Sequence, residues 1–292
     1  MKRELFNGVA TALITPFKNG KVDFDALSTI VEQQINSNIS ALVVCGTTGE
    51  PSTMTTAEKE SVISFVLEQV NGYIPVIVGT GGNNTAEVIA TAKRYQKLGA
   101  TAQLCVTPYY NKTTQAGLVA HYTAIADSDT LPIILYNVPG RTGLNMLPET
   151  VAKLSEHRNI IALKEANCDL VQLSEVFRLC GDNITVYSGA DELIVPMMSL
   201  GAMGVISVVA NAMPKETSDM VAMYLSGMHR EARDTQLRML PFIKALFRQT
   251  SPSPIKAAMQ MLGLCSDEVR LPLITLNKKE KEELRKIMEG IL

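Results

Sequence analysis

The feature that most limits how this chain can fold is a repeated alternation of short apolar segments with longer amphipathic ones. Each apolar segment is followed by Gly, Pro, Ser or Thr and then by residues with helical periodicity. The expected strands lie at residues 8–17, 41–46, 75–81, 101–108, 132–139, 160–166, 184–190 and 204–211. The expected helices lie at residues 24–37, 57–70, 84–98, 115–126, 148–156, 169–180, 191–200 and 214–226. Strict alternation of this kind predicts a parallel sheet with crossover helices.

The number of units and the character of the strands narrow the architecture further. The apolar segments are nearly continuous, as expected for strands that are buried on both faces. Eight units favour a closed (β/α)8 TIM barrel over an open, doubly wound sheet. We therefore predict an α/β barrel formed by residues 1–226. Residues 227–292 are expected to be helical, with a break near residues 250–254, and to form a C-terminal extension packed on the barrel.

Composition excludes several classes of function. The net charge of -2, with 19% charged residues, does not predict the basic face that nucleic acids require. No apolar stretch approaches the roughly 20 residues that span a bilayer, and no signal peptide is visible, so we expect a cytoplasmic protein. The five dispersed cysteines are typical of reduced thiols. The three histidines do not have the spacing of metal ligands, so we expect no metal.

A lysine at the end of an apolar strand is the strongest sign of chemistry. Lys164 directly follows the apolar stretch 160–163, at the end of a barrel strand where catalytic side chains lie. A buried amine is costly to keep charged, and a neutral amine can attack a carbonyl carbon to form a Schiff base. Tyr136 ends the preceding strand in the same way, so we expect the two side chains to be close. A snorkelling lysine and an ordinary strand-end tyrosine are the alternatives.

Other strand ends carry groups that suit carboxylates. Thr47 and Thr48 lie between glycines after the second strand, where hydroxyls and exposed backbone N–H groups can hold an anion. Arg141 follows a Pro-Gly turn after the fifth strand and suits bidentate capture of a carboxylate. An ordinary glycine turn and a surface arginine remain possible at these places. The glycine-rich residues 79–85 lack the spacing of nucleotide-binding motifs, and we interpret them mainly as a tight turn.

Six motifs occur together and in order, and they closely resemble the dihydrodipicolinate synthase (4-hydroxy-tetrahydrodipicolinate synthase) family. This family belongs to the pyruvate-dependent class I aldolases, which include N-acetylneuraminate lyase. The likeness runs from Gly8 through the C-terminal tail. The motifs that carry it are residues 46–50 (GTTGE), 107–111 (TPYYN), 136–143 (YNVPGRTG), 164–166 (KEA), 188–189 (SG) and 204–207 (GVIS).

The resemblance implies a reaction and a set of catalytic residues. The reaction is condensation of pyruvate with L-aspartate 4-semialdehyde to 4-hydroxy-tetrahydrodipicolinate, in lysine and diaminopimelate biosynthesis. Lys164 would form the Schiff base with pyruvate. Thr47, Tyr136 and Tyr110 would form a hydroxyl relay, with Tyr110 entering the site of a neighbouring subunit. The family needs no metal or organic cofactor.

The resemblance also implies substrate-binding groups and an assembly. Thr48 would hold the pyruvate carboxylate, and Arg141 would bind the carboxylate of the semialdehyde. Gly189 and Ile206 would line the pocket through their backbone. The family is typically a homotetramer built from two tight dimers, so we expect that assembly here.

Some family members are inhibited by lysine at an interface between subunits. The residues that match this possible allosteric site are Asn83, Glu87 and Tyr109. Two histidines of sensitive bacterial members are replaced here by Thr56 and Lys59. A second cation at Lys59 disfavours a lysine ligand. The sequence therefore predicts weak or absent inhibition by lysine.

Two alternatives to this function remain at the level of sequence. A sister aldolase, acting on N-acetylneuraminate or a keto-deoxy-sugar acid, shares the lysine and the tyrosine but needs a larger pocket. Arg141 favours a short acidic aldehyde instead. The other alternative is a barrel that binds a keto acid as a sensor without turnover, although all the expected catalytic groups are present.

Overall fold

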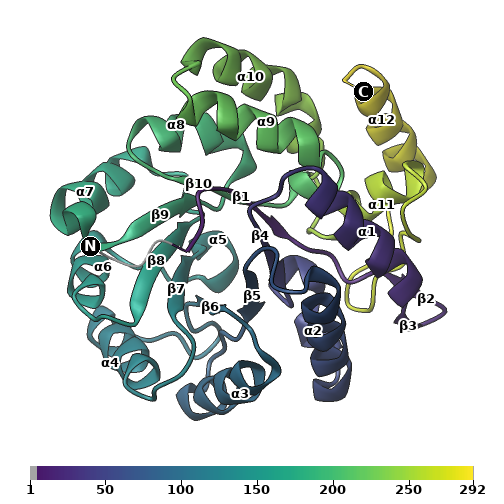
Figure 1. Cartoon of the computed structure of the whole chain (residues 1–292). Coiled ribbons are helices and arrows are strands. Elements are labelled where there is room, and N and C mark those ends of the chain that lie inside the picture. The colour runs from purple at the N-terminus through teal and green to yellow at the C-terminus, as the bar shows by residue number, and fades with distance from the viewer. Residues whose placement is uncertain (1–4, 292) are drawn as a thin grey trace. The chain divides into compact units, whose positions relative to one another are not determined.

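Eight strands close into a barrel in the computed structural model, which describes residues 5–291 (Figure 1). The hydrogen-bonded order is β1-β10-β9-β8-β7-β6-β5-β4. The strands are β1 (Gly8–Ala12), β4 (Ala41–Val44), β5 (Val76–Gly79), β6 (Ala102–Val106), β7 (Ile133–Asn137), β8 (Ile160–Glu165), β9 (Thr185–Ser188) and β10 (Gly204–Ser207). The predicted α/β barrel is confirmed, and helices follow it at the C-terminal end of the chain as predicted.

The chain divides into two compact units, and each is described by itself. One unit contains residues 75–206 and the described part of the N-terminal segment before Gly8, and the other contains residues 8–74 and 207–292. The expected division into a barrel at 1–226 and an extension at 227–292 does not coincide with these two units, and it stays a prediction.

In the unit of residues 75–206, parallel strands alternate along the chain with helices. Helices α3 (Thr85–Leu98), α4 (Gln115–Ala126), α6 (Pro148–Ser155) and α7 (Leu170–Cys180) pack side by side along the outer side of these strands (Figure 1). Side-chain caps begin three of them, because Asn84, Thr114 and Asp169 each accept a hydrogen bond from a backbone N–H of the first turn. These caps explain why the expected helix boundaries agree closely with the observed ones.

Two elements of this unit differ from their predicted form. The expected helix at 191–200 begins as a 3-10 turn, Asp191–Leu193, and continues as the short helix α8 (Ile194–Ser199). The strand expected at 132–139 ends at Asn137, and a single helical turn, α5 (Pro139–Thr142), follows it where the sequence predicted a Pro-Gly turn. Proline at its first position and Gly143 with φ +66° after its end explain this turn.

In the unit of residues 8–74 and 207–292, β1 pairs in parallel with β4. The first strand was expected to reach residue 17, but it ends at Ala12. Phe17–Lys18 (β2) and Lys21–Val22 (β3) instead form an antiparallel hairpin. Asn19 and Gly20 both have positive φ, as a two-residue hairpin turn requires. The Asn-Gly pair, just after the expected strand, was therefore an overlooked signal of a hairpin.

The same unit holds six helices among its described residues. They are α1 (Phe24–Asn36), α2 (Thr56–Val70), α9 (Pro214–Leu225), α10 (His229–Ala245), α11 (Ser253–Met261) and α12 (Lys278–Glu289). The last expected strand stops at Ser207 and is followed by a 3-10 turn, Val209–Asn211. The Asn211 side chain explains this change, because it accepts from the Ile14 backbone N–H and donates to the Ala12 carbonyl.

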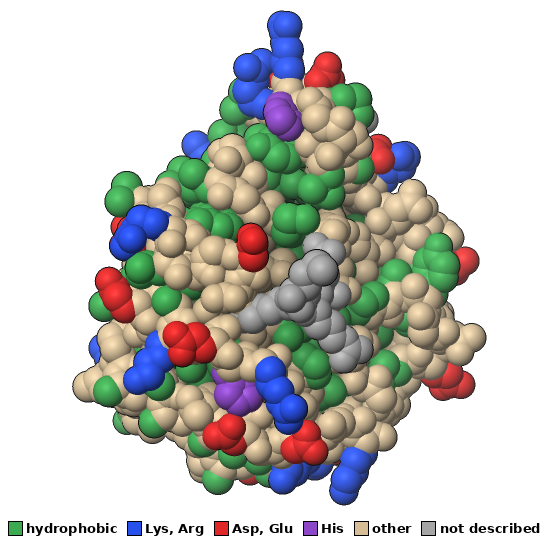
Figure 2. Space-filling view, turned by 60° about the vertical axis from the view of Figure 1, so that its left-hand side comes forward, with side chains coloured by type: hydrophobic (Ala, Val, Ile, Leu, Met, Phe, Trp, Pro, Cys, Tyr) green, Lys and Arg blue, Asp and Glu red, His purple; other side chains and the backbone are tan. Residues whose placement is uncertain are grey.

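Figure 2 shows acidic and basic side chains intermixed over one face of the molecule, rather than gathered into a patch of one sign. This agrees with the small net charge. None of the helices within residues 5–291 combines the length and the apolar character needed to cross a membrane. Over the same residues, no group of three or more His, Cys, Asp or Glu side chains is arranged to hold a metal ion.

We predict that Gly81→Ala destabilises the fold strongly, whereas Gly82→Ala does not. A Cβ at Gly81 would lie 2.2 Å from the Val106 backbone nitrogen, and relieving this contact requires a shift of β6. At Gly82 it would lie 3.5 Å from a Val88 methyl group, which is an ordinary contact. Urea unfolding should show a loss of about 1–3 kcal/mol for the first variant and less than about 0.5 kcal/mol for the second. Equal midpoints for the two variants would contradict this account.

Candidate active site

Lys164 is buried at the end of β8, with 5% of its surface exposed. In the parallel register Tyr136 of β7 is its partner on one side and Tyr187 of β9 on the other. Side chains alternate between the two faces of a strand, so partners in register point to the same face. The Lys164 Nζ lies 4.4 Å from the centroid of the Tyr136 ring. The structure thus confirms the predicted proximity of these two side chains.

The surroundings of Lys164 favour the neutral form of its amine. Burial lowers its pKa to about 8, the negative charge of Asp191 opposes this shift, and the positive charge of Arg141 adds to it. With this pKa about one amine in ten is neutral at pH 7, far more than for a free lysine. A neutral amine is the form that attacks carbonyl carbon.

Gly189 provides the space that the lysine side chain occupies. A Cβ at this position would lie 3.1 Å from Lys164 Cε and 2.8 Å from the Ala166 Cβ. The Gly189 backbone N–H donates to the Glu165 carbonyl at 2.7 Å, which fixes the turn after β9. Ile206, the other expected pocket residue, is buried in β10. Whether these two residues bind substrate through their backbone stays a prediction.

The opposite faces of the same strand ends carry a polar pair that sequence reasoning missed. Asn137 and Glu165 are partners in the register, one residue after Tyr136 and Lys164. The Asn137 Nδ2 donates to both carboxylate oxygens of Glu165 at 3.0 Å. The Asn167 backbone N–H donates to the same carboxylate at 2.7 Å. Two polar residues in matching positions at the ends of the two strands were the signal that could have revealed this pair.

Burial is the main influence on the pKa of Glu165 in this pair. It raises the pKa of Glu165 to about 7, although the hydrogen bond from Asn137 opposes the shift. Asn137 also donates to Asn145 at 2.9 Å and accepts from the Met146 backbone N–H at 3.0 Å. The pair therefore ties the ends of β7 and β8 to the segment that follows α5. It thereby fixes the backbone of the residues next to Tyr136 and Lys164 in the two strands.

Arg141 lies on α5, which follows β7 next to the strands and apart from the outer helices (Figure 1). Its side chain is exposed, and its charge contributes to the pKa of Lys164. The hydroxyl of Thr142 holds this turn, since it donates to the Val138 carbonyl and accepts from Thr107 Oγ1 at 3.2 Å. An exposed cation close to a buried amine suits the capture of an anionic substrate.

Tyr109 and Tyr110 follow β6 and are both exposed. Tyr110 is 92% exposed, so its side chain is not packed beside Lys164 within its own chain. Its φ of +68° is unusual for a bulky aromatic residue, and such strain is often found at functional positions. The structure therefore does not gather Tyr110 with Lys164 and Tyr136 in one chain.

The Thr47–Thr48 turn belongs to the other unit. Thr47–Gly49 forms a 3-10 turn, closed by hydrogen bonds from the Gly49 N–H to the Gly46 carbonyl and from the Glu50 N–H to the Thr47 carbonyl. Thr47 is exposed and Thr48 is buried. The turn is thus a compact loop, and its capacity to hold an anion stays a prediction.

The possible allosteric residues lie around the start of α3 and the loop after β6. The Asn83 carbonyl accepts a hydrogen bond from Asn111 at 3.0 Å. Glu87 is exposed and forms an ion pair with Arg94 at 3.0 Å. Tyr109 is exposed. A lysine ligand at Glu87 would have to compete with this arginine.

Comparison with known proteins shows extensive similarity. Residues 5–291 match the family described as the dihydrodipicolinate synthetase family. The chain is 51% identical over 285 residues to a 4-hydroxy-tetrahydrodipicolinate synthase of Geobacter metallireducens, covering 98% of both chains. It is similar to a dihydrodipicolinate synthase structure from Thermotoga maritima, with a TM-score of 0.97, 42% identity and coverage of 99% and 100%.

A second solved structure holds a substrate-sized molecule. It is a chloride-inhibited dihydrodipicolinate synthase from Acinetobacter baumannii in complex with pyruvate. Its TM-score with this chain is 0.95 and its identity 39%, with coverage of 98% of this chain and 99% of that chain.

We predict that the reactivity of Lys164 levels off near pH 8. Below its pKa the neutral fraction of an amine rises about tenfold per pH unit, and above it the fraction is constant. Reductive methylation with formaldehyde, followed by peptide mass spectrometry from pH 6 to 10, measures this rate. Lys215 is the matched control, because its hydrogen bond to Asp219 raises its pKa and its labelling should still rise at pH 10. Continued rise at Lys164 beyond pH 9 would contradict the prediction.

Proposed function

This chain belongs to the dihydrodipicolinate synthetase family, and we propose that it condenses pyruvate with L-aspartate 4-semialdehyde to 4-hydroxy-tetrahydrodipicolinate. The observation that carries the proposal is the buried Lys164 beside Tyr136, with a pKa lowered to about 8. An amine of this kind suits Schiff-base chemistry with a keto acid. The similar enzyme of Acinetobacter baumannii binds pyruvate, which supports the choice of keto acid.

The proposed reaction begins on the lysine nitrogen. The neutral Lys164 Nζ attacks C2 of pyruvate, and loss of water gives an imine. The imine draws electrons from C3, so a proton leaves C3 and an enamine forms. The enamine carbon attacks the aldehyde carbon of the semialdehyde, and the resulting alkoxide is protonated. The substrate amine then attacks C2, closes the ring and releases Lys164. The lysine itself supplies the electron-withdrawing group, so this route needs no metal or organic cofactor.

The proposed proton carriers are the hydroxyls of Thr47, Tyr136 and Tyr110. Tyr136 is supported by its position against Lys164. Tyr110 is supported by its exposed side chain and strained backbone, which suit a group that serves a neighbouring copy of the chain. Thr47 is supported by its exposed hydroxyl in the turn after β4. Together they could move protons without a histidine.

The proposed substrate contacts use two anion-binding groups. Thr48 and the backbone N–H groups of its turn would hold the pyruvate carboxylate. Arg141 would hold the carboxylate of the semialdehyde. Its exposed side chain and the effect of its positive charge on the pKa of Lys164 support this role. Gly189 and Ile206 would line the pocket through their backbone. The homotetramer built from two dimers and the cytoplasmic location remain part of this proposal.

We expect borohydride to trap pyruvate on Lys164. Wild-type protein incubated with pyruvate and reduced should carry a 1-carboxyethyl group, the reduced form of the pyruvate imine, on the peptide that contains Lys164, and should lose activity. Lys164→Ala should carry no adduct, because the attacking amine is gone. Lys215→Ala, which removes an exposed lysine, should be labelled like the wild type.

Product formation completes this test. Purified protein without added metal should form the cyclic product from pyruvate and the semialdehyde. An adduct that persists in Lys164→Ala would exclude the mechanism. Preferred turnover of N-acetylneuraminate or a keto-deoxy-sugar acid would instead favour the sister aldolases.

We predict that lysine inhibits this enzyme weakly or not at all. The Lys59 cation and the ion pair between Glu87 and Arg94 both oppose the binding of a second ammonium group. Activity should therefore be complete at millimolar lysine. The double variant Thr56→His with Lys59→His should be more sensitive than the wild type. Clear inhibition of the wild type below millimolar lysine would overturn this expectation.

A further inference from the structure

A buried ion pair joins the turn after β4 to the C-terminal segment of the chain. Glu50 is 3% exposed and Lys256, on α11, is fully buried. The Lys256 Nζ donates to Glu50 Oε1 at 2.5 Å and to the Glu268 carbonyl at 2.9 Å. The second carboxylate oxygen of Glu50 accepts from the Arg270 backbone N–H at 3.0 Å. Both oxygens of this carboxylate are thus held by residues more than 200 positions later in the chain.

The Arg270 side chain extends the same cluster. Its guanidinium forms two hydrogen bonds with Glu58, at 3.0 and 2.6 Å, and one with the Thr53 carbonyl at 3.0 Å. This hydrogen bonding holds the pKa of Glu58 at about 2. The ring of Phe17 lies under both cations, 4.1 Å from Lys256 Nζ and 4.3 Å from Arg270 Cζ. Glu50 and the residues that follow it, Thr53 and Glu58, are therefore held by one group of contacts.

Stability alone does not account for a charge pair buried this deeply. Removing two charges from water is costly, and replacing such a pair by apolar residues is often neutral or stabilising. Here the pair has a second consequence, because Glu50 is also a backbone member of the Thr47–Thr48 turn. Its N–H donates to the Thr47 carbonyl at 3.2 Å and closes the turn.

The backbone of this turn is strained at both ends. Cys45 and Glu50 both have a φ of +54°, a conformation that residues with a side chain rarely adopt. Such a conformation persists only where surrounding contacts over-determine it. The Glu50 carboxylate, held by Lys256 and by the Arg270 backbone, is the contact that fixes the second strained residue.

We infer that Lys256 and Arg270 are positioning residues for the Thr47–Thr48 turn. The C-terminal segment holds Glu50, and Glu50 holds the turn whose Thr48 hydroxyl and backbone N–H groups bind the carboxylate of the keto acid. The inference rests on the proposed function, because it takes Thr48 as a ligand of pyruvate. The two cations themselves do not touch the substrate.

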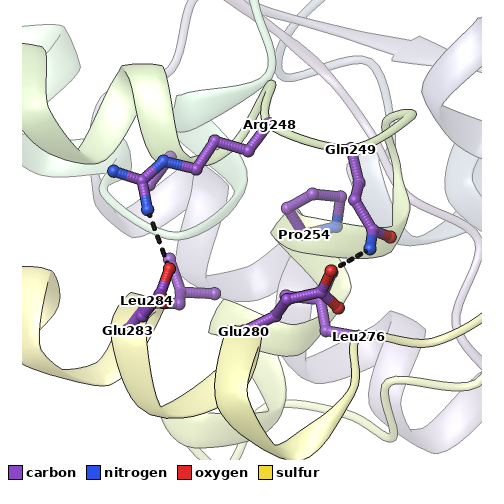
Figure 3. A pocket seen from close by; sticks show the side chains of 8 residues that line it. Arg248, Gln249, Pro254, Leu276, Glu280, Glu283 and Leu284 are labelled. Carbon is purple, nitrogen blue, oxygen red and sulfur yellow. Dashed lines mark hydrogen bonds and ion pairs between the residues drawn. The ribbon is translucent and has the colours of Figure 1, made fainter.

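The test compares Lys256→Met with Arg248→Met in the full-length protein. Methionine keeps most of the length of the lysine side chain but removes its charge. Arg248 lies in the same C-terminal segment, in an exposed ion pair with Glu283 at 3.3 Å beside a small pocket (Figure 3). The KM for pyruvate should rise roughly tenfold in Lys256→Met, as expected for one weakened charged hydrogen bond. Its kcat at saturating pyruvate should stay within about a factor of two, and Arg248→Met should match the wild type.

A purely structural role gives a different result. It would lower the unfolding temperature of Lys256→Met and leave the KM of the folded protein unchanged. Steady-state assays are therefore run below the unfolding transition, measured by circular dichroism for each variant. A KM within about a factor of two of the wild-type value, in folded Lys256→Met, overturns the inference.

Lys256→Met leaves the Glu50 carboxylate without its cation and can therefore fail to fold. A second variant covers this case. The double variant Glu50→Gln with Lys256→Met contains neither charge and should show the same rise in KM. If neither variant folds while Arg248→Met does, the pair serves folding and the inference is wrong. Absence of turnover by the wild type would count against the proposed function and would be visible before any variant is compared.

Discussion

The parallel register of β7 and β8 is the constraint on which the candidate site depends. It makes Tyr136 the partner of Lys164 and, one residue later, Asn137 the partner of Glu165. Because side chains alternate along a strand, the first pair faces one side of the sheet and the second pair faces the other. The positions of the Lys164 amine and of the Asn137–Glu165 pair therefore both follow from the register of β7 and β8. A slip of the register by one residue would exchange their environments.

Two buried lysines show how differently the same side chain can be used. Lys256 has a carboxylate at 2.5 Å and a carbonyl at 2.9 Å, so its ammonium group is compensated. Lys164 lies against the ring of Tyr136, with the charges of Asp191 and Arg141 acting in opposite directions on its pKa. Burial lowers the pKa of both amines. The surroundings of the first suit a fixed structural cation, and those of the second suit a nucleophile.

Much of the fold could be predicted from local patterns, because each strand–helix unit is encoded by a short stretch of sequence. The expected pairing of Tyr136 with Lys164 followed from comparing the ends of successive strands, and the structure confirms it. Long-range pairs such as Glu50 with Lys256 could not be found in this way, since nothing near either residue indicates its partner. The hairpin at Asn19 and Gly20 was predictable from its turn residues, but these residues lie between the expected strand at 8–17 and the expected helix at 24–37 and were assigned to neither.

The sequence by itself determined the order of the elements, the strand ends that carry polar groups and the resemblance to the family to which the chain belongs. These properties depend on residues that are close in the chain. Only the tertiary structure decided which side chains are buried, and with them the pKa of Lys164, the clamp between Asn137 and Glu165 and the anchoring of Glu50. Burial and charge compensation arise when distant segments pack together, so no local pattern in the sequence can fix them.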